Sequence, residues 1–273
     1  MIDHAAYKDQ GFALAKGLFR RAELEAIRHD AKRVFAAQML RHGILSSPNV
    51  SESEFEQGMF KLFELDLQGF VNCGKQAQHL ISLHRLSLDE RIMAALGKLG
   101  LSFANISTRP LLYFNSRRLA KKEVYWRLST HQDWRSMQGS LDATVVWVPL
   151  IDINRSLGAL EVIPGSHRLG LLRSNMIDGY GHVDEPVDTS RMVPIEVEAG
   201  DALFFSALLV HRSGTNITDS IRWSCHFRYN NLAEPTFVER GYPHPYIYGP
   251  QEDLITADFP TGEQVARTFD GKK

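Results

Sequence analysis

The pattern of apolar residues changes near residue 102, and this change restricts the possible folds more than any other feature. Beyond it the apolar runs are short, and Gly, Pro, Asn and Asp separate them at the spacing typical of an antiparallel β-rich domain. Turns are indicated at 151–158, 164–166 and 199–201. The sequence predicts strands at 111–115, 124–132, 143–150, 159–163, 193–196, 202–206 and 221–229.

Residues 1–101 are dominated by patterns typical of helices. Within 20–40, apolar residues recur at steps of three and four, which indicates one buried stripe along a helix. The residues of this stripe are Leu24, Ile27, Ala31, Val34, Phe35 and Leu40. We expect this stripe to pack against the β-rich part of the chain.

Other elements are predicted on both sides of this helix. The spacing of Ser87 and Glu90 is that of a capping box, and it indicates where one further helix begins. The predictions are a short strand within 11–19 and helices at 54–69, 75–86 and 88–99.

Two segments lack clear periodicity. Residues 170–192 are predicted to form a long loop of the kind that often serves as a lid. The proline-containing tail is predicted to be irregular, with a short helix near 262–269. We therefore expect one domain over 1–273, with a mostly helical support region at 1–101, a β-core at 102–230 and a tail at 231–273.

Composition excludes several classes of protein. With 44% hydrophobic and 23% charged residues, the chain is expected to be an ordinary globular protein with a sizeable core. The net charge of −1 provides no basic field for nucleic acid or acidic membranes, and no apolar run is long enough to span a bilayer. Cys73 and Cys225 are expected to be reduced thiols, and no secretory signal is evident, so a cytoplasmic location is expected. The sequence does not indicate the oligomeric state.

His131 and Asp133 are candidate metal ligands at the end of a run that looks extended. Residues i and i+2 of a strand point to the same face, so one imidazole and one carboxylate could reach a single point. Together they make two thirds of the two-histidine, one-carboxylate triad that holds Fe(II) and leaves three coordination positions open. Such a pair is common by chance, so a third ligand is needed to support the interpretation.

His211 is the candidate third ligand. It follows the apolar run 202–210, and it could equally be a core or turn histidine. Arg222 begins the next strand pattern, in which apolar and polar residues alternate along 221–229. The polar face of that strand either lies in solvent or lines a charged pocket. In a pocket, the arginine would offer a planar fork of donors suited to a carboxylate.

The order and spacing of several short motifs resemble the phytanoyl-CoA dioxygenase family of Fe(II)/2-oxoglutarate oxygenases. The resemblance covers roughly residues 8–230. The matching pieces are 9–19, 131–133, 146–152, 158–168, 199–201, 211–216 and Arg222.

The resemblance implies a fold and a set of roles. The fold would be a double-stranded β-helix, or jelly roll, with supporting N-terminal helices. His131, Asp133 and His211 would bind Fe(II). Arg222, helped by Ser213, would hold the distal carboxylate of 2-oxoglutarate.

The resemblance also implies the reaction. Gln132 and Trp147 would contact the co-substrate or form the wall of its pocket. With O2, 2-oxoglutarate would be oxidatively decarboxylated to succinate and CO2 while a substrate is oxidised. Halogenating relatives lack the carboxylate found at Asp133, so its presence favours hydroxylation or a related desaturation or epimerisation.

The substrate is the least determined feature. Residues after the Asp ligand are expected to form the substrate side, and Trp134, Arg135 and Gln138 are the candidates. They favour a small polar molecule over a long acyl-CoA. His167 lies in a turn and is expected to be structural, whereas His226 either lines the pocket or is a packed polar residue.

Three functions remain open from the residues. The first is a 2-oxoglutarate-dependent hydroxylase of a small polar metabolite, with a peptide substrate not excluded. The second is a cupin-like metal-dependent isomerase or lyase, and the third is a non-catalytic metal-binding module. Arg222 and Ser213 favour the first, because only an oxygenase of this type needs a carboxylate clamp there.

Overall fold

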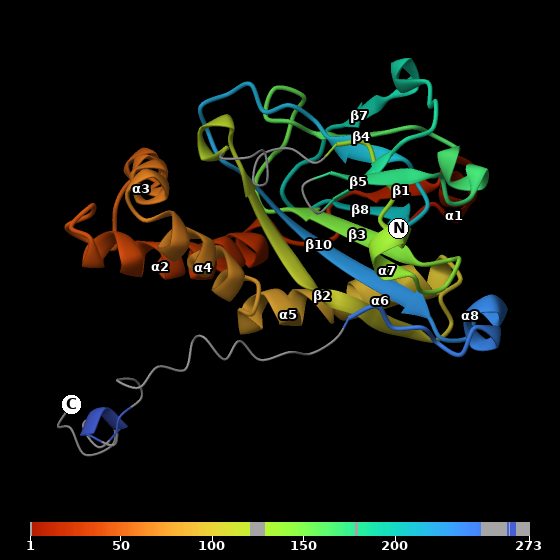
Figure 1. The fold of residues 1–273 in the computed structure, drawn as a ribbon, viewed down its shortest axis with the longest axis horizontal. Coiled ribbons are helices and arrows are strands. Elements are labelled where there is room, and N and C mark those ends of the chain that lie inside the picture. The colour runs from red at the N-terminus through yellow and green to blue at the C-terminus, as the bar shows by residue number, and fades with distance from the viewer. Residues whose placement is uncertain (1, 121–128, 178–179, 247–260, 262, 266–273) are drawn as a thin grey trace.

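The computed structural model describes residues 2–120, 129–177, 180–246, 261 and 263–265. Helices lie along one side of a twisted β-core, in which the long strands β2 (Ala104–Asn115) and β10 (Arg222–Asn231) run side by side (Figure 1). None of the described helices is both long and apolar enough to cross a membrane. The helices are α1 His4–Gln10, α2 Arg21–Arg41, α3 Glu52–Leu65, α4 Leu67–Ala77, α5 Ile81–Ser87, α6 Glu90–Lys98, α7 Trp134–Met137 and α8 Pro235–Glu239.

The β-core consists of antiparallel sheets. The main sheet has the order β1-β8-β3-β10-β2, with β1 at Phe12–Ala15, β8 at Ala202–Ser206 and β3 at Thr144–Pro149. A smaller sheet has the order β7-β4-β9, with β7 at Val193–Ile195, β4 at Leu160–Val162 and β9 at His211–Ser213. The predicted jelly-roll core with supporting helices is confirmed.

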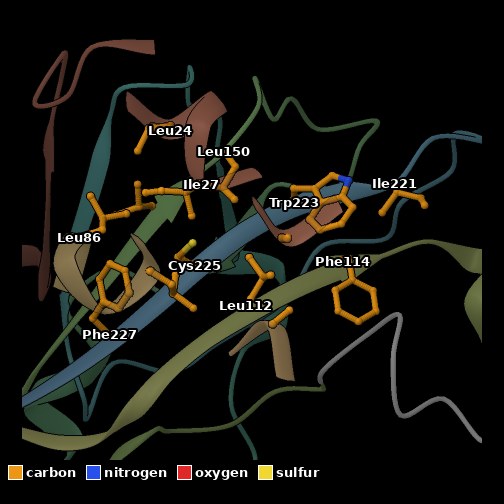
Figure 2. Packing of buried hydrophobic residues seen from close by; sticks show 14 of the residues in the cluster. Leu24, Ile27, Leu86, Leu112, Phe114, Leu150, Ile221, Trp223, Cys225 and Phe227 are labelled. Carbon is orange, nitrogen blue, oxygen red and sulfur yellow. The ribbon is translucent and has the colours of Figure 1, made fainter. Parts of the chain in front are cut away.

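The two faces of the main sheet bury different cores. On one face Trp223, Cys225 and Phe227 of β10 meet helix residues that include Leu24 and Ile27 (Figure 2). The predicted α2 stripe is buried here except at its end, where Leu40 is exposed, because alternation sends these β10 side chains towards the helices. On the other face, Val145, Trp147, Leu203 and Phe205 pack against Leu160 and Val162 of the smaller sheet.

The predicted helix boundaries between 54 and 99 are wrong at the chain breaks. Asp66 ends α3 and caps α4, because its carboxylate accepts a hydrogen bond from the Gly69 N–H at 2.8 Å. A break at 78–80 then separates α4 from α5. The prediction of a capping box formed by Ser87 and Glu90 is also wrong. The Ser87 hydroxyl donates to the His84 carbonyl, and Asp89 is the residue that caps α6.

The predicted unstructured loop at 170–192 is wrong, since it contains a two-stranded ribbon. Strands β5 (Ser174–Ile177) and β6 (Tyr180–Val183) pair antiparallel. The ribbon lies beside the segment that precedes the candidate ligands, because the Val183 N–H donates to the Thr130 carbonyl at 3.0 Å.

Two other predictions fall partly outside the described residues. For the predicted strand at 124–132, residues 124–128 lie outside them, and in the described part His131 forms only an isolated antiparallel bridge with His211. For the predicted helix near 262–269, the structure describes a helical turn at 263–265.

Candidate metal centre

His131, Asp133 and His211 meet at one buried point between the two sheets. One ligand atom from each residue lies within 4.8 Å of the others. The Nε2 atoms of His131 and His211 lie 3.9 and 3.7 Å from the two Asp133 carboxylate oxygens. The backbones of the two histidines exchange hydrogen bonds of 2.9 and 3.1 Å, which sets their rings side by side. The structure therefore brings the three predicted ligands together.

The route by which Asp133 reaches this point differs from the prediction. Asp133 has helical backbone angles (φ −65°, ψ −26°) and immediately precedes α7. His131 belongs to the bridge, so the chain changes from extended to helical between the two ligands. The prediction that both side chains lie on one face of a strand is therefore wrong. The tight turn into α7 brings them together instead.

Hydrogen bonds fix both imidazoles in the orientation that a metal requires. Nδ1–H of His131 donates to the Ser129 carbonyl at 2.6 Å, and Nδ1–H of His211 donates to the Leu209 carbonyl at 2.9 Å. Each Nε2 therefore carries a lone pair directed at the carboxylate. Burial lowers the pKa of His131, and it lowers the pKa of His211 to about 4, so both are neutral near pH 7. Neutral imidazole is the form that binds metal.

Asp133 is held ionised by a buried ion pair that sequence reasoning missed. Nη2 of Arg228 donates to Asp133 Oδ1 at 2.8 Å, and both side chains are buried. Burial raises the pKa of Asp133, but the charge and hydrogen bond of Arg228, together with the two neighbouring histidines, outweigh it, so the pKa lies below its usual range. The signal for Arg228 was present, because it lies on the same alternating face as Arg222.

The second Asp133 oxygen supports a metal at this point. Oδ2 is buried and has no hydrogen-bond partner among the described residues. A buried carboxylate oxygen without a partner is costly, and a cation between two neutral imidazoles would satisfy it. The donor set of two nitrogens and one carboxylate oxygen fits a divalent transition metal such as iron.

Arg222 is a buried cation that faces the same pocket. Its guanidinium donates to the Gly158 carbonyl, to Asn115 Oδ1 at 3.1 Å and to Ser213 Oγ at 3.5 Å. None of the ion pairs found among the described residues includes it. Burial lowers its pKa to about 10, so the group stays protonated near pH 7. A buried guanidinium that contacts only neutral groups is suited to receive a carboxylate.

Gly158 places the carbonyl that Arg222 contacts. Its backbone has φ +84°, and an added Cβ would lie 2.7 Å from the Gly214 carbonyl oxygen. Glycine is therefore required for the close approach of this turn to the strand that carries Ser213.

The polar face of β10 lines the pocket, so the second of the two sequence alternatives is confirmed. His226 lies between Arg222 and Arg228, and its ring meets Tyr113 edge-on with 4.7 Å between centroids. Nδ1 of His226 is buried and has no hydrogen-bond partner in the part of the chain that the structure describes. The residues that line the pocket are Tyr113, His131, Asp133, Leu160, His211, Ser213, Arg222, His226 and Arg228.

The structure does not place Gln132 or Trp147 on this pocket wall. The Gln132 amide donates to the carbonyls of Gly170 and Leu208 and accepts from the Leu172 N–H, so it ties three backbone segments together. Its amide is thus engaged by backbone groups, and its expected contact with a co-substrate stays a prediction. Trp147 pairs in register with His226 but belongs to the core between the sheets.

The candidate substrate residues also lie elsewhere. The Trp134 indole donates to the Ser140 carbonyl, Arg135 donates to the Leu172 carbonyl, and Gln138 is exposed at the end of α7. None of the three lines the metal pocket, because α7 turns the chain away directly after Asp133. His167 contacts the Lys8 carbonyl and is structural, as expected.

Comparisons with known proteins agree with this geometry. The family model described as phytanoyl-CoA dioxygenase (PhyH) matches residues 7–224. A probable phytanoyl-CoA dioxygenase of Caenorhabditis elegans is 34% identical over 150 residues, which cover 46% of this chain and 48% of that protein. A methylphosphonate hydroxylase of Gimesia maris is 38% identical over 120 residues, which cover 42% of this chain and 43% of that protein. The chain thus spans about half the length, or less, of these relatives.

Solved structures share the fold. The epimerase SnoN from nogalamycin biosynthesis, in complex with Fe3+ and alpha ketoglutarate, matches with a TM-score of 0.56 and 20% identity over 90% of both chains. The non-heme monooxygenase ThoJ matches with a TM-score of 0.52 and 19% identity over 84% of this chain and 77% of that chain.

Proposed function

The chain belongs to the phytanoyl-CoA dioxygenase family, and from this premise we propose that it is a non-haem Fe(II)- and 2-oxoglutarate-dependent dioxygenase that hydroxylates a small polar metabolite. One observation carries the proposal. The half-buried His131, the buried Asp133 and His211, and the buried guanidinium of Arg222 face a single pocket, and Arg222 has no acidic partner among the described residues.

Each side chain has a definable part in this activity. His131, Asp133 and His211 would hold Fe(II), and Arg222 with Ser213 would bind the distal carboxylate of 2-oxoglutarate. Iron held in this way would supply the oxidation of substrate by O2, coupled to conversion of 2-oxoglutarate to succinate and CO2. Arg228 keeps Asp133 ionised and oriented, and burial of the pocket excludes water.

The residues that line the metal pocket and the name of one relative support a small polar substrate. Leu160 is the single aliphatic residue among those that line the metal pocket. The relative from Gimesia maris is named for the hydroxylation of methylphosphonate, which is a small anion. A carboxylate at Asp133 favours hydroxylation, desaturation or epimerisation over halogenation, and we propose hydroxylation.

The alternatives of an isomerase, a lyase or a non-catalytic binding module do not explain why Arg222 is buried. A metal site without 2-oxoglutarate would leave Arg222 buried with no counter-anion among the described residues. Such a cation is costly to bury.

Anaerobic spectroscopy tests the proposal. Fe(II) and 2-oxoglutarate added without O2 are expected to give a weak metal-to-ligand charge-transfer band in the visible region. His211→Ala should abolish the band, because it removes an iron ligand, whereas His167→Ala should retain it. A folded, iron-loaded protein that shows no band would contradict the oxygenase assignment. Succinate formation measured across a metabolite library would then identify the substrate.

A further inference from the structure

A second cavity adjoins the metal pocket. Its volume is about 340 Å³, at the small end of the range for small-molecule sites. Arg228 lines both spaces, so one side chain forms the boundary between them. The cavity is lined by Ile106, Ser107, Thr108, Arg109, Leu111, Arg228, His244 and Tyr246.

The walls of this cavity suit an anion. They include two arginines, one histidine and three hydroxyl groups, and none of the described residues that line it is acidic. The apolar side chains Ile106 and Leu111 complete it. From the described residues, an anion here would meet hydrogen-bond donors and no like charge.

Arg228 retains donor capacity beyond its contact with Asp133. The residue is 7% exposed, and Nη2 donates to Asp133 Oδ1. Nε is also buried and has no hydrogen-bond partner among the described residues. A buried guanidinium N–H without a partner is costly, and an oxyanion in the adjoining cavity would satisfy it.

The sheet is irregular at this position. The β10–β2 register shifts between His226 and Arg228 and again between Arg228 and Tyr229. Arg228 pairs with Thr108 and Tyr229 with Ile106, so β2 carries extra residues at both shifts. Bulges of this kind bend a strand and re-aim side chains, and they are common next to active sites. The bend accounts for a cavity beside an otherwise regular strand pair.

We propose that this cavity is the subsite for an oxyanion group of the primary substrate, a small phosphonate, phosphate ester or carboxylate. The inference rests on the proposed function and adds the substrate class to it. Arg228 would donate to the anion while it holds Asp133, and Arg109, His244 and Tyr246 would complete the site. Because one guanidinium contacts both the anion and a metal ligand, the carbon to be oxidised lies close to the anionic group.

Calorimetric titration with methylphosphonate and with inorganic phosphate tests the subsite. The protein would be loaded with Zn(II), which has no redox chemistry, and saturated with 2-oxoglutarate so that Arg222 is occupied. Saturable binding is expected. Arg228→Gln should weaken it roughly tenfold or more, because a hydrogen bond to a charged group is lost. Arg109→Gln should weaken it several-fold.

The matched control is Arg117→Gln, which removes an exposed arginine that is paired with Asp219 and lies outside the cavity. It should bind both probes as the unaltered protein does. If Arg228→Gln fails to fold, Arg109→Gln and Tyr246→Phe decide the outcome. Absence of binding, or binding that both arginine variants leave unchanged, would overturn the subsite.

The two proposals fail separately. A charge-transfer band without anion binding would reject the subsite and keep the oxygenase. Anion binding that depends on Arg109 and Arg228, without any band, would keep the subsite and reject the oxygenase.

Discussion

Arg222 and Arg228 lie on the same face of β10, but their surroundings differ. Arg228 is neutralised by Asp133 at 2.8 Å, whereas the contacts of Arg222 are a carbonyl, an amide oxygen and a hydroxyl. At the scale of the residue, this difference assigns Arg228 to the metal-binding carboxylate and leaves Arg222 for an external anion.

Replacement of Arg222 tests that assignment. Arg222→Met keeps much of the apolar stem and removes the guanidinium, so 2-oxoglutarate should bind roughly tenfold or more weakly while metal affinity is retained. Titration of the charge-transfer band with 2-oxoglutarate measures the first quantity, and titration with Fe(II) at saturating 2-oxoglutarate measures the second. Arg212→Met is the matched control, because Arg212 lies between His211 and Ser213 but pairs with Glu161 outside the pocket. Equal affinity in the two variants would reject the clamp.

At the scale of the element, β10 connects the core to the site. Its apolar face packs on the helices, and its polar face lines the pocket.

The helices are in turn joined by an ion pair between α2 and α6. Arg91 contacts Glu23 at 3.0 Å and Asp89 at 2.8 Å, and its guanidinium lies over the Phe19 ring. The layer of helices is thus held together by ion pairs as well as by apolar packing.

This ion pair predicts a component of acid sensitivity. Hydrogen bonds from Arg91 and then Arg20 lower the pKa of Glu23 from 4.5 to about 2. The folded-state pKa is depressed, so the stabilisation is present above pH 4.5 and is lost as pH falls towards 2. Glu23→Gln should therefore lower the free energy of unfolding at pH 7 by up to about 1 kcal/mol, since the pair is partly exposed.

Urea denaturation at pH 7 and near pH 2.5 measures this effect. The difference between Glu23→Gln and the unaltered protein should shrink at the lower pH. Glu25→Gln is the control, because Glu25 pairs with Arg28 within α2 and does not join two helices. A deficit for Glu23→Gln that is independent of pH would mean that packing, and not the charge, is responsible.

At the scale of the whole molecule, the site joins parts that are distant in the sequence. His131 and Asp133 lie directly before α7, His211 lies in the smaller sheet and Arg222 lies in the main sheet. A metal and an anion bound here would fasten the two sheets to each other. Ligands that bind only the folded state raise its stability.

Addition of Fe(II) and 2-oxoglutarate without O2 should therefore raise the melting temperature. At about 100 times the dissociation constant the gain is roughly 2.7 kcal/mol, which corresponds to about 5–10 °C for a chain of this size. Differential scanning calorimetry measures the shift, and a chelator should reverse it. His211→Ala should show little or no shift. A shift of the same size in that variant would place the metal elsewhere.

The sequence alone was enough to predict the class of the fold and the three residues that meet in the candidate metal centre. Strand alternation and turn residues predicted the antiparallel core, and the α2 stripe predicted the helix packed on it. The order of His131, Asp133, His211 and Arg222 predicted the metal site. These features are local patterns or short motifs, and each of them can be recognised within a single segment of the chain.

The surroundings of each polar side chain could be learned only from the tertiary structure. Alternation divides β10 into two faces, but it does not say that the smaller sheet covers one of them, so the positions of His226 and Arg228 in the pocket stayed open. Gln132 lies next to both ligands in sequence, yet backbone groups at 170, 172 and 208 use its amide. The cavity beside Arg228 needs a strand irregularity and tail residues from 244 and 246. Each of these outcomes depends on pairing between distant segments, which local patterns do not encode.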